Sequence, residues 1–127
     1  MWPPRSSIDR RAAMRIPKDA TLLRIFLGEA DRRDGLPLFE AIVQEARQNN
    51  LAGATVLRGR MGFGHSSRLH SSKILALSED LPVVVEIVDA PDKIDAFLPI
   101  LDVMVGDRGL ICLERIQVLR YGPNRSV

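Results

Sequence analysis

Residues 81–91 read LPVVVEIVDAP, and this stretch decides the expected fold. Its segment Pro82–Val88 is a nearly continuous β-branched run, which predicts a central strand buried on both faces. Pro91 then suits the first turn of a helix, which should be kinked or weakened at Pro99 and end at Gly106. The residues that form the apolar face of this helix are Ile94, Phe97, Leu98, Leu101 and Val105.

The same reasoning extends outward along the chain. Apolar and β-branched residues predict strands over Thr21–Leu27, Ala54–Arg60 and Leu110–Tyr121. Leu36–Asn49 has the periodicity of an amphipathic helix, and a loop is expected over Gly28–Gly35. The order β-α-β-β-α-β is typical of an α+β, ferredoxin-like domain, in which a four-stranded antiparallel sheet carries both helices on one face. Because the strands are too apolar for a fully exposed second face, we expect self-association.

Composition predicts one cytoplasmic domain. The 127 residues are 46% hydrophobic and 27% charged, as in ordinary globular proteins. The longest apolar runs are far shorter than the roughly 20 residues that span a bilayer, and no secretory signal is expected. The single cysteine, Cys112, cannot form an internal disulfide, which agrees with a reducing compartment. We expect residues 1–20 to be a flexible extension, residues 21–122 to form the domain and residues 123–127 to be a tail.

The charge distribution argues against nucleic-acid binding despite a pI of about 9.1. Residues 1–20 contain five basic and two acidic residues, which leaves 13 basic and 14 acidic residues in the remainder. The expected domain is therefore nearly neutral and lacks the positive field of a nucleic-acid-binding protein. One tyrosine and one tryptophan also provide few platforms for base stacking.

A polar loop is the first candidate functional segment. Met61–Ser72 contains glycines, serines and both histidines, which is too polar for a core and too long for a tight hairpin. Between Ala46 and Ser78 there is no acidic residue. Gly62 and Gly64 permit close approach of backbone N–H groups to a ligand, so this region predicts an anion site. A flexible, solvated loop is the alternative. The basic residues of the region are Arg47, Arg58, Arg60, Arg68 and Lys73.

The turn Gly106–Gly109, with sequence GDRG, is the second candidate. It lies between the second predicted helix and the last predicted strand. Its glycines and Arg108 could form another anion-binding turn. A helix stop followed by a tight turn explains the same residues, and the local sequence favours that interpretation.

The sequence contains no convincing catalytic or metal centre, and we expect no enzyme activity. His65 and His70 lie five residues apart without nearby carboxylates or thiols, whereas a stable metal site usually needs three or four ligands. The acidic residues Asp80, Glu86 and Asp89 are expected to be strand-end and surface charges rather than an acid/base pair.

Three segments are distinctive in combination: GATVLRG (Gly53–Gly59), GFG (Gly62–Gly64) and LSEDLPVVVEIVD (Leu77–Asp89). Together they resemble the domain of unknown function 190 family, and the resemblance extends from about Leu22 to Tyr121. That family is regarded as PII-like. The resemblance therefore implies a ferredoxin-like subunit, assembly into homotrimers and ligand clefts between neighbouring subunits.

The resemblance also implies ligand-binding residues. In PII proteins the base of the loop after the second strand helps to enclose an adenine nucleotide, and the turn before the last strand grips phosphates. Arg108 would stand near the phosphate-binding lysine of that turn, and Arg120 matches one of two terminal arginines, while Val118 takes the place of the other. The uridylylated tyrosine of the PII loop is missing here. The implied ligand-binding residues are Arg58, Arg60, Gly62, Phe63, Gly64, Gly106, Asp107, Arg108, Gly109 and Arg120.

The implied function is that of a PII-like regulator. It would bind an adenine nucleotide such as AMP, ADP or ATP, or a similar anion, at intersubunit clefts, and signal through its loop to a partner protein. Members of the family are often encoded beside fluoride-exporting membrane proteins, which suggests a membrane transporter as the partner. The alternative is a metal-binding trimer of the divalent-cation-tolerance type that uses His65 and His70.

Overall fold

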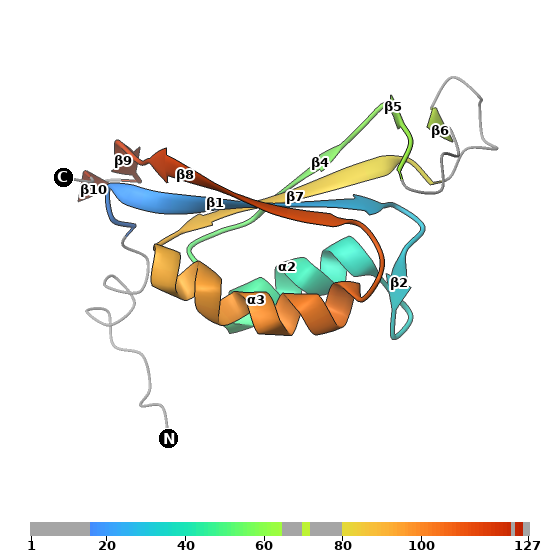
Figure 1. Cartoon of the computed structure of the whole chain (residues 1–127), viewed down its shortest axis with the longest axis horizontal. Helices are drawn as coiled ribbons and strands as arrows, with labels where there is room; N and C mark the ends of the chain where they lie inside the picture. The colour runs from blue at the N-terminus through green and yellow to red at the C-terminus, as the bar shows by residue number, and fades with distance from the viewer. Residues whose placement is uncertain (1–15, 65–69, 72–79, 123, 126–127) are drawn as a thin grey trace.

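The computed structural model describes residues 16–64, 70–71, 80–122 and 124–125 of the chain. Its main sheet consists of four antiparallel strands: β1 (Asp19–Gly28), β4 (Thr55–Arg58), β7 (Pro82–Asp89) and β8 (Leu110–Gln117). Their order across the sheet is β4-β7-β1-β8, so that β1 and β7 form the central pair (Figure 1). This confirms the predicted α+β, ferredoxin-like arrangement.

Two helices, α2 (Leu38–Gln48) and α3 (Pro91–Val105), cover one face of the sheet (Figure 1). Pro91 stands in the first turn of α3, where the missing N–H costs no helical hydrogen bond. The helix continues past Pro99 and ends at Gly106, whose φ of 65° lies in the left-handed region.

Short strands occupy parts of the predicted loops and the first two residues of the first predicted helix. β2 (Arg32–Arg33) pairs with β3 (Leu36–Pro37), so α2 begins at Leu38 rather than at Leu36. The turn between them contains two residues with positive φ, as two-residue hairpins require. Within the predicted loop, β5 (Met61–Gly62) pairs with β6 (His70–Ser71).

The last predicted strand is divided in two. β8 ends at Gln117, and β9 (Arg120–Tyr121) follows after Val118 and Leu119. β9 pairs with β10 (Asn124–Arg125) instead of with the main sheet. The backbone N–H of Val118 donates to the carbonyl oxygen of Lys18 at 2.8 Å, which holds the residues before β9 against the start of β1.

The core lies between the helices and one face of the central strands. Alternate residues of β1 and β7 point toward the helices and are buried, because successive side chains of a strand point to opposite faces. The prediction that β7 is central is confirmed, but within the single chain only one of its faces is buried, contrary to the prediction. The residues that alternate with the buried ones are half-buried, because no described residues form a layer over the second face. The main core residues are Leu23, Ile25, Leu38, Ile42, Val85, Ile87, Ile94, Phe97 and Leu101.

The second face of the sheet, which we call the open face, contains an apolar row and a charged row. The strand register aligns Leu57, Val84, Phe26 and Leu110 in one row across all four strands. The exposed fractions of Leu57, Phe26 and Leu110 are 50%, 38% and 58%. The charged row lies two residues along each strand from the apolar row, and it consists of Thr55, Glu86, Arg24 and Cys112.

Arg24 connects two acidic residues on the open face. Its Nε lies 2.8 Å from Oε2 of Glu86, and its Nη1 lies 3.6 Å from Oε1 of Glu114. The hydrogen bond to Glu86 raises the pKa of Arg24, so the guanidinium remains charged. A permanent positive charge, paired with two carboxylates, therefore lies near the middle of the open face.

The core assignment can be tested on a single helix. Phe97 is 1% exposed and Val103 is 70% exposed, and both belong to α3. We expect Phe97→Ala to lower the free energy of unfolding by about 3–5 kcal/mol, because it removes a buried ring and leaves a cavity. Val103→Ala should change it by less than about 0.5 kcal/mol. Urea unfolding followed by circular dichroism measures both, and equal losses would contradict the assignment.

Candidate functional site

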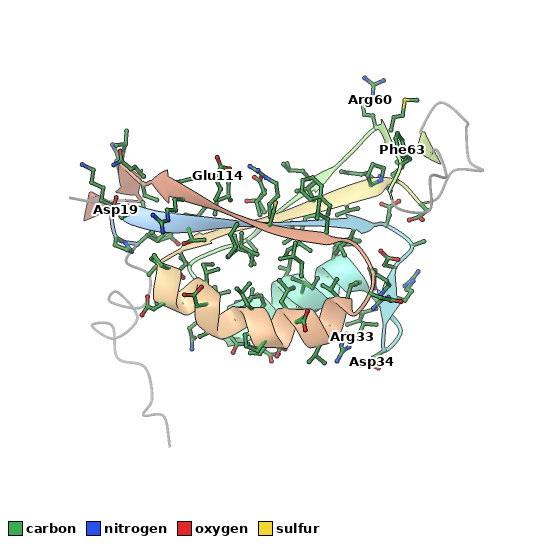
Figure 2. All side chains as sticks on the ribbon, in the orientation of Figure 1. Asp19, Arg33, Asp34, Arg60, Phe63 and Glu114 are labelled. Atoms are coloured by element: carbon green, nitrogen blue, oxygen red, sulfur yellow. The ribbon has the colours of Figure 1, made fainter. Side chains whose placement is uncertain are left out.

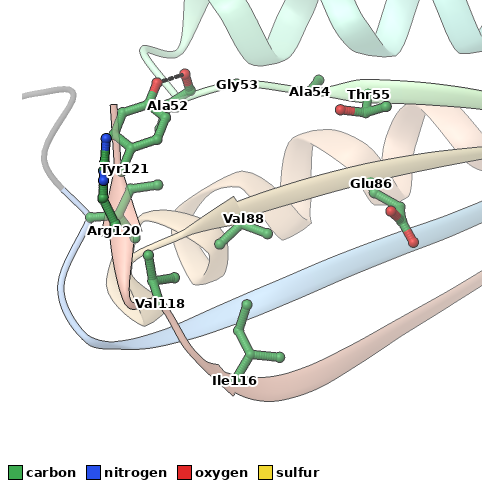
Figure 3. Close-up of a pocket in the computed structure, with 11 residues that line it drawn as sticks. Ala52, Gly53, Ala54, Thr55, Glu86, Val88, Ile116, Val118, Arg120 and Tyr121 are labelled. Atoms are coloured by element: carbon green, nitrogen blue, oxygen red, sulfur yellow. Dashed lines mark hydrogen bonds between the residues drawn. The ribbon is translucent and has the colours of Figure 1, made fainter. Parts of the chain in front are cut away.

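A pocket of about 460 Å³ lies at the end of the sheet where β4 begins and β8 finishes (Figure 3). One wall is the backbone segment 52–55, which leads into β4. Glu86 and Val88 of β7 form the floor, and Arg120 and Tyr121 of β9 close the outer side. The pocket opens on the same side of the sheet as the apolar and charged rows, because Glu86 belongs to both the pocket and the charged row.

The pocket combines apolar walls with few polar groups. The aliphatic side chains of Ile16, Val88 and Ile116 line it. The Thr55 hydroxyl, the Glu86 carboxylate, Arg120 and the peptide groups of the 52–55 segment supply the hydrogen-bonding groups. Such a mixture suits a small molecule with apolar surfaces and polar edges.

A buried carboxylate supports one wall of this pocket. Asp89 is fully buried, and its Oδ2 accepts a hydrogen bond from the N–H of Ala52 at 2.9 Å. Its Oδ1 accepts the N–H of Ala90 at 2.7 Å. Burial raises the pKa of Asp89, and the two backbone donors partly oppose that shift. The expectation that Asp89 is a strand-end or surface charge is therefore wrong about its exposure, because the carboxylate points inward, toward backbone donors.

Tyr121 contacts the same residue, Ala52, through its carbonyl group. Its hydroxyl donates to the carbonyl oxygen of Ala52 at 2.7 Å (Figure 3). The neighbouring Arg120 donates from Nε to the carbonyl oxygen of Gly122 at 3.1 Å. Sequence reasoning singled out Arg120 but missed Tyr121, because nothing local indicates that a tyrosine near the end of the chain reaches residue 52.

The first predicted site segment lies at the opposite end of β4 from the pocket. Figure 2 shows Arg60 and Phe63 exposed at that end, beside β5. Gly62 lies in β5, and Gly64 follows Phe63. Arg58, the last residue of β4, forms an ion pair through Nη2 with the carboxylate of Glu29.

The Gly106–Gly109 turn follows α3 and lies near the same end of the sheet. Arg108 donates three hydrogen bonds to backbone carbonyl oxygens: to Val105 at 3.2 Å, to Met104 at 3.1 Å and to Arg32 at 2.8 Å. Arg108 thus holds the last turn of α3 and ties it to the β2–β3 hairpin. A side chain at Gly109 would overlap the carbonyl oxygen of Phe26 in β1, which explains why this position needs glycine. Asp107 and Gly106 are exposed in the same turn.

The predicted site residues therefore fall into two groups in one chain. Arg58 contacts Glu29, the residue after β1, and Arg108 contacts Arg32, four residues beyond the end of β1. Arg120 follows β8, whose last residue pairs with the first residue of β1. The ten residues of β1 separate the two groups by roughly 30 Å at about 3.3 Å per residue. The pocket residues of segment 52–55, Glu86 and Tyr121 were not predicted, although GATVLRG and VVVEIVD belong to the segments that carry the family resemblance.

Metal ligation was the alternative interpretation of the two histidines. Among the residues that the structure describes, no group of three or more His, Cys, Asp and Glu side chains could hold a metal ion. His65 lies outside the described residues, and His70 is described only as part of β6. In the same part of the chain, no helix is long and apolar enough to cross a membrane.

Comparison with known families gives a match over most of the chain. The model of the DUF190 family, described as "Uncharacterized ACR", matches residues 20–118. A UPF0166 protein of Aquifex aeolicus is 38% identical over 106 residues, which cover 84% of this chain and 98% of the relative. A UPF0166 protein of Methanocaldococcus jannaschii is 32% identical over 101 residues, which cover 80% of this chain and 93% of the relative.

Solved structures show the same fold at low sequence identity. The structure of CPII from Thiomonas intermedia K12, a nitrogen regulatory PII-like protein bound to ADP, AMP and bicarbonate, matches with a TM-score of 0.56 and 16% identity. The match covers 80% of this chain and 90% of CPII. A second CPII structure, bound to ADP and bicarbonate, matches with a TM-score of 0.53 and 18% identity over the same shares. The fold predicted from the resemblance is therefore confirmed as PII-like.

The buried carboxyl of Asp89 predicts a pH-dependent stability. Because burial raises its folded-state pKa, its stabilising contribution is complete below the unfolded-state value of about 3.9 and is lost as pH rises through the folded-state pKa. The NH2 group of an asparagine would face one of the two backbone N–H donors, whereas the hydroxyl oxygen of a protonated carboxyl still accepts, so we expect Asp89→Asn to lose about 1–3 kcal/mol of stability at acidic pH. This deficit should shrink as pH rises. Urea unfolding between about pH 3.5 and 7 measures it.

Asp95→Asn is the control, because Asp95 is exposed on α3. Its stability difference from the wild type should stay within about 0.5 kcal/mol at every pH. A deficit of Asp89→Asn that stays constant over the whole pH range would contradict the buried, perturbed carboxyl.

Proposed function

The chain belongs to the DUF190 family, and we propose that it is a PII-like regulator that binds an adenine nucleotide in a cleft completed by a neighbouring copy. One observation carries the proposal. The pocket with Arg120 lies at one end of the sheet, and the arginine- and glycine-rich segments lie at the other, roughly 30 Å away. A second copy can bring its opposite end to the pocket, whereas a single chain cannot.

The pocket supplies the features that a nucleobase and its sugar need. Its aliphatic walls suit the flat faces of a purine, and the peptide groups of segment 52–55 suit its hydrogen-bonding edge. The Glu86 carboxylate can accept hydrogen bonds from hydroxyl or amino groups. The PII-like protein CPII, which has the same fold, binds ADP and AMP.

Basic side chains and glycines suit the phosphates. Arg120 provides a cation at the pocket itself. From the neighbouring copy, Arg60 would add a second cation, and Arg58 would do so by exchanging its pairing with Glu29 for a phosphate. Three of the five N–H donors of Arg108 hold backbone carbonyl groups, so this residue would shape the Gly106–Gly109 turn and offer its other donors to the ligand.

Assembly through the open face would unite the two groups. The row Leu57, Val84, Phe26 and Leu110 exposes large apolar side chains in contiguous positions, which is typical of a protein interface. We propose a homotrimer, in which the open faces pack against one another around a three-fold axis.

Regulation would act through the segment Met61–Ser72. A nucleotide that contacts the base of this segment in one conformation favours that conformation, and the population shift alters affinity for a partner. We propose that the partner is a membrane transporter. In this scheme the protein itself carries out no chemical step.

Nucleotide binding is directly measurable. Isothermal titration with AMP, ADP and ATP should give heat for at least one of them. Arg120→Gln should weaken binding of that nucleotide by about 10-fold or more, because a hydrogen bond between charged groups contributes about 1.5–3 kcal/mol. Arg115→Gln is the matched control, because Arg115 is exposed on β8 and does not line the pocket. Absence of heat for all three nucleotides would refute the proposal.

The assembly is measurable by light scattering coupled to size-exclusion chromatography. The wild type should elute with three times the chain mass of 14.1 kDa. Phe26→Glu should shift it toward the monomer, because a carboxylate in the apolar row would be buried without a partner. Val103→Glu, on the exposed side of α3, should leave the trimer intact. A monomeric wild type, or a trimeric Phe26→Glu variant, would rule out the open face as the interface.

A further inference from the structure

A single residue in the pocket wall, Ala52, is held through both of its backbone polar groups. The N–H of Ala52 donates to Asp89 at 2.9 Å, and the carbonyl oxygen of Ala52 accepts from Tyr121 at 2.7 Å. We propose that Asp89 and Tyr121 are positioning residues, which hold the backbone of Ala52 so that Gly53–Thr55 present their polar groups to the ligand. The inference rests on the proposed function, because it concerns affinity at the same pocket.

The wall needs such support because it lies outside regular secondary structure. Helix α2 ends at Gln48, and the N–H of Leu51 still donates to Ala46 at 3.1 Å. The sheet ladder begins only at Thr55, which pairs with Glu86. Between these points, the hydrogen bonds of Ala52 to Asp89 and Tyr121 connect the stretch to β7 and β9. Gly53 has no atoms within 4 Å of its Cβ position, so side-chain packing does not fix it either.

Asp89 is a rigid anchor for the N–H group of Ala52. It is fully buried at the end of β7, and its second oxygen accepts the N–H of Ala90 at the start of α3. A carboxylate held in this way cannot rotate into solvent, so the position of Ala52 follows the position of β7 and α3. The same strand contributes Glu86 and Val88 to the pocket floor. The position of the wall relative to the floor of the pocket is therefore fixed by β7.

Tyr121 anchors the carbonyl group of Ala52 to the outer side of the pocket. It belongs to β9, which pairs with β10 and lies outside the main sheet. Its hydroxyl therefore ties β9, including the adjacent Arg120, to the opposite wall (Figure 3). Loss of this hydroxyl should loosen both the backbone wall and Arg120. It removes no charged group that could bind the ligand.

Isothermal titration with ADP compares the wild type, Tyr121→Phe, Asp89→Asn and the double variant. Tyr121→Phe should weaken ADP binding by about 3- to 10-fold, because one neutral hydrogen bond contributes about 0.5–1.5 kcal/mol. The double variant should bind about as weakly as the weaker single variant, since both bonds hold the same residue, Ala52. Ile42→Val is the control: it shortens a fully buried side chain of α2, so it should lower stability and leave ADP affinity unchanged.

Each outcome decides the inference. Equal ADP affinity of Tyr121→Phe and the wild type would overturn it, and so would an affinity loss in Ile42→Val as large as that in Tyr121→Phe. If the wild type binds none of AMP, ADP and ATP, the proposed function fails, whether or not Asp89 and Tyr121 position Ala52. Amide hydrogen exchange at Ala52 and Gly53 then decides: faster exchange in Tyr121→Phe supports the positioning role, and unchanged exchange contradicts it.

Discussion

The pairing of β1 with β7 in a single register is the constraint on which the rest of the structure depends. Side chains alternate between the two faces of a strand, so this register assigns every residue of both strands to the helical face or to the open face. A shift by one residue would bury Arg24 and Glu86 beneath the helices and expose Leu23 and Ile25. Burial of the aliphatic set therefore also decides where the charges lie.

The open face and the pocket follow from the same alternation. Glu86 is close to Arg24 and lines the pocket because it alternates with the buried residues of β7. The apolar row crosses all four strands because each strand contributes one large residue at the same level. A sheet with helices on one face thus presents, on the other, both a surface for assembly and one half of a binding cleft.

Much of the fold was predictable from local patterns. The β-branched run before Asp89, the proline at the start of α3 and the apolar spacing of both helices indicate the element order, and the order limits the topology to few choices. The candidate site was predictable only in part. Arginines and glycines are recognisable along the chain, but their grouping into two distant ends depends on where β1 carries them.

By itself, the sequence determined the element order, the central position of β7 and membership of the DUF190 family, because hydrophobic periodicity and short motifs are properties of neighbouring residues. Only the tertiary structure decided that β7 is covered on one face, that Asp89 is buried and that Tyr121 reaches Ala52. The physical reason is distance along the chain. Residues 52, 89 and 121 meet through sheet pairing and chain reversal, and no local pattern encodes such a contact.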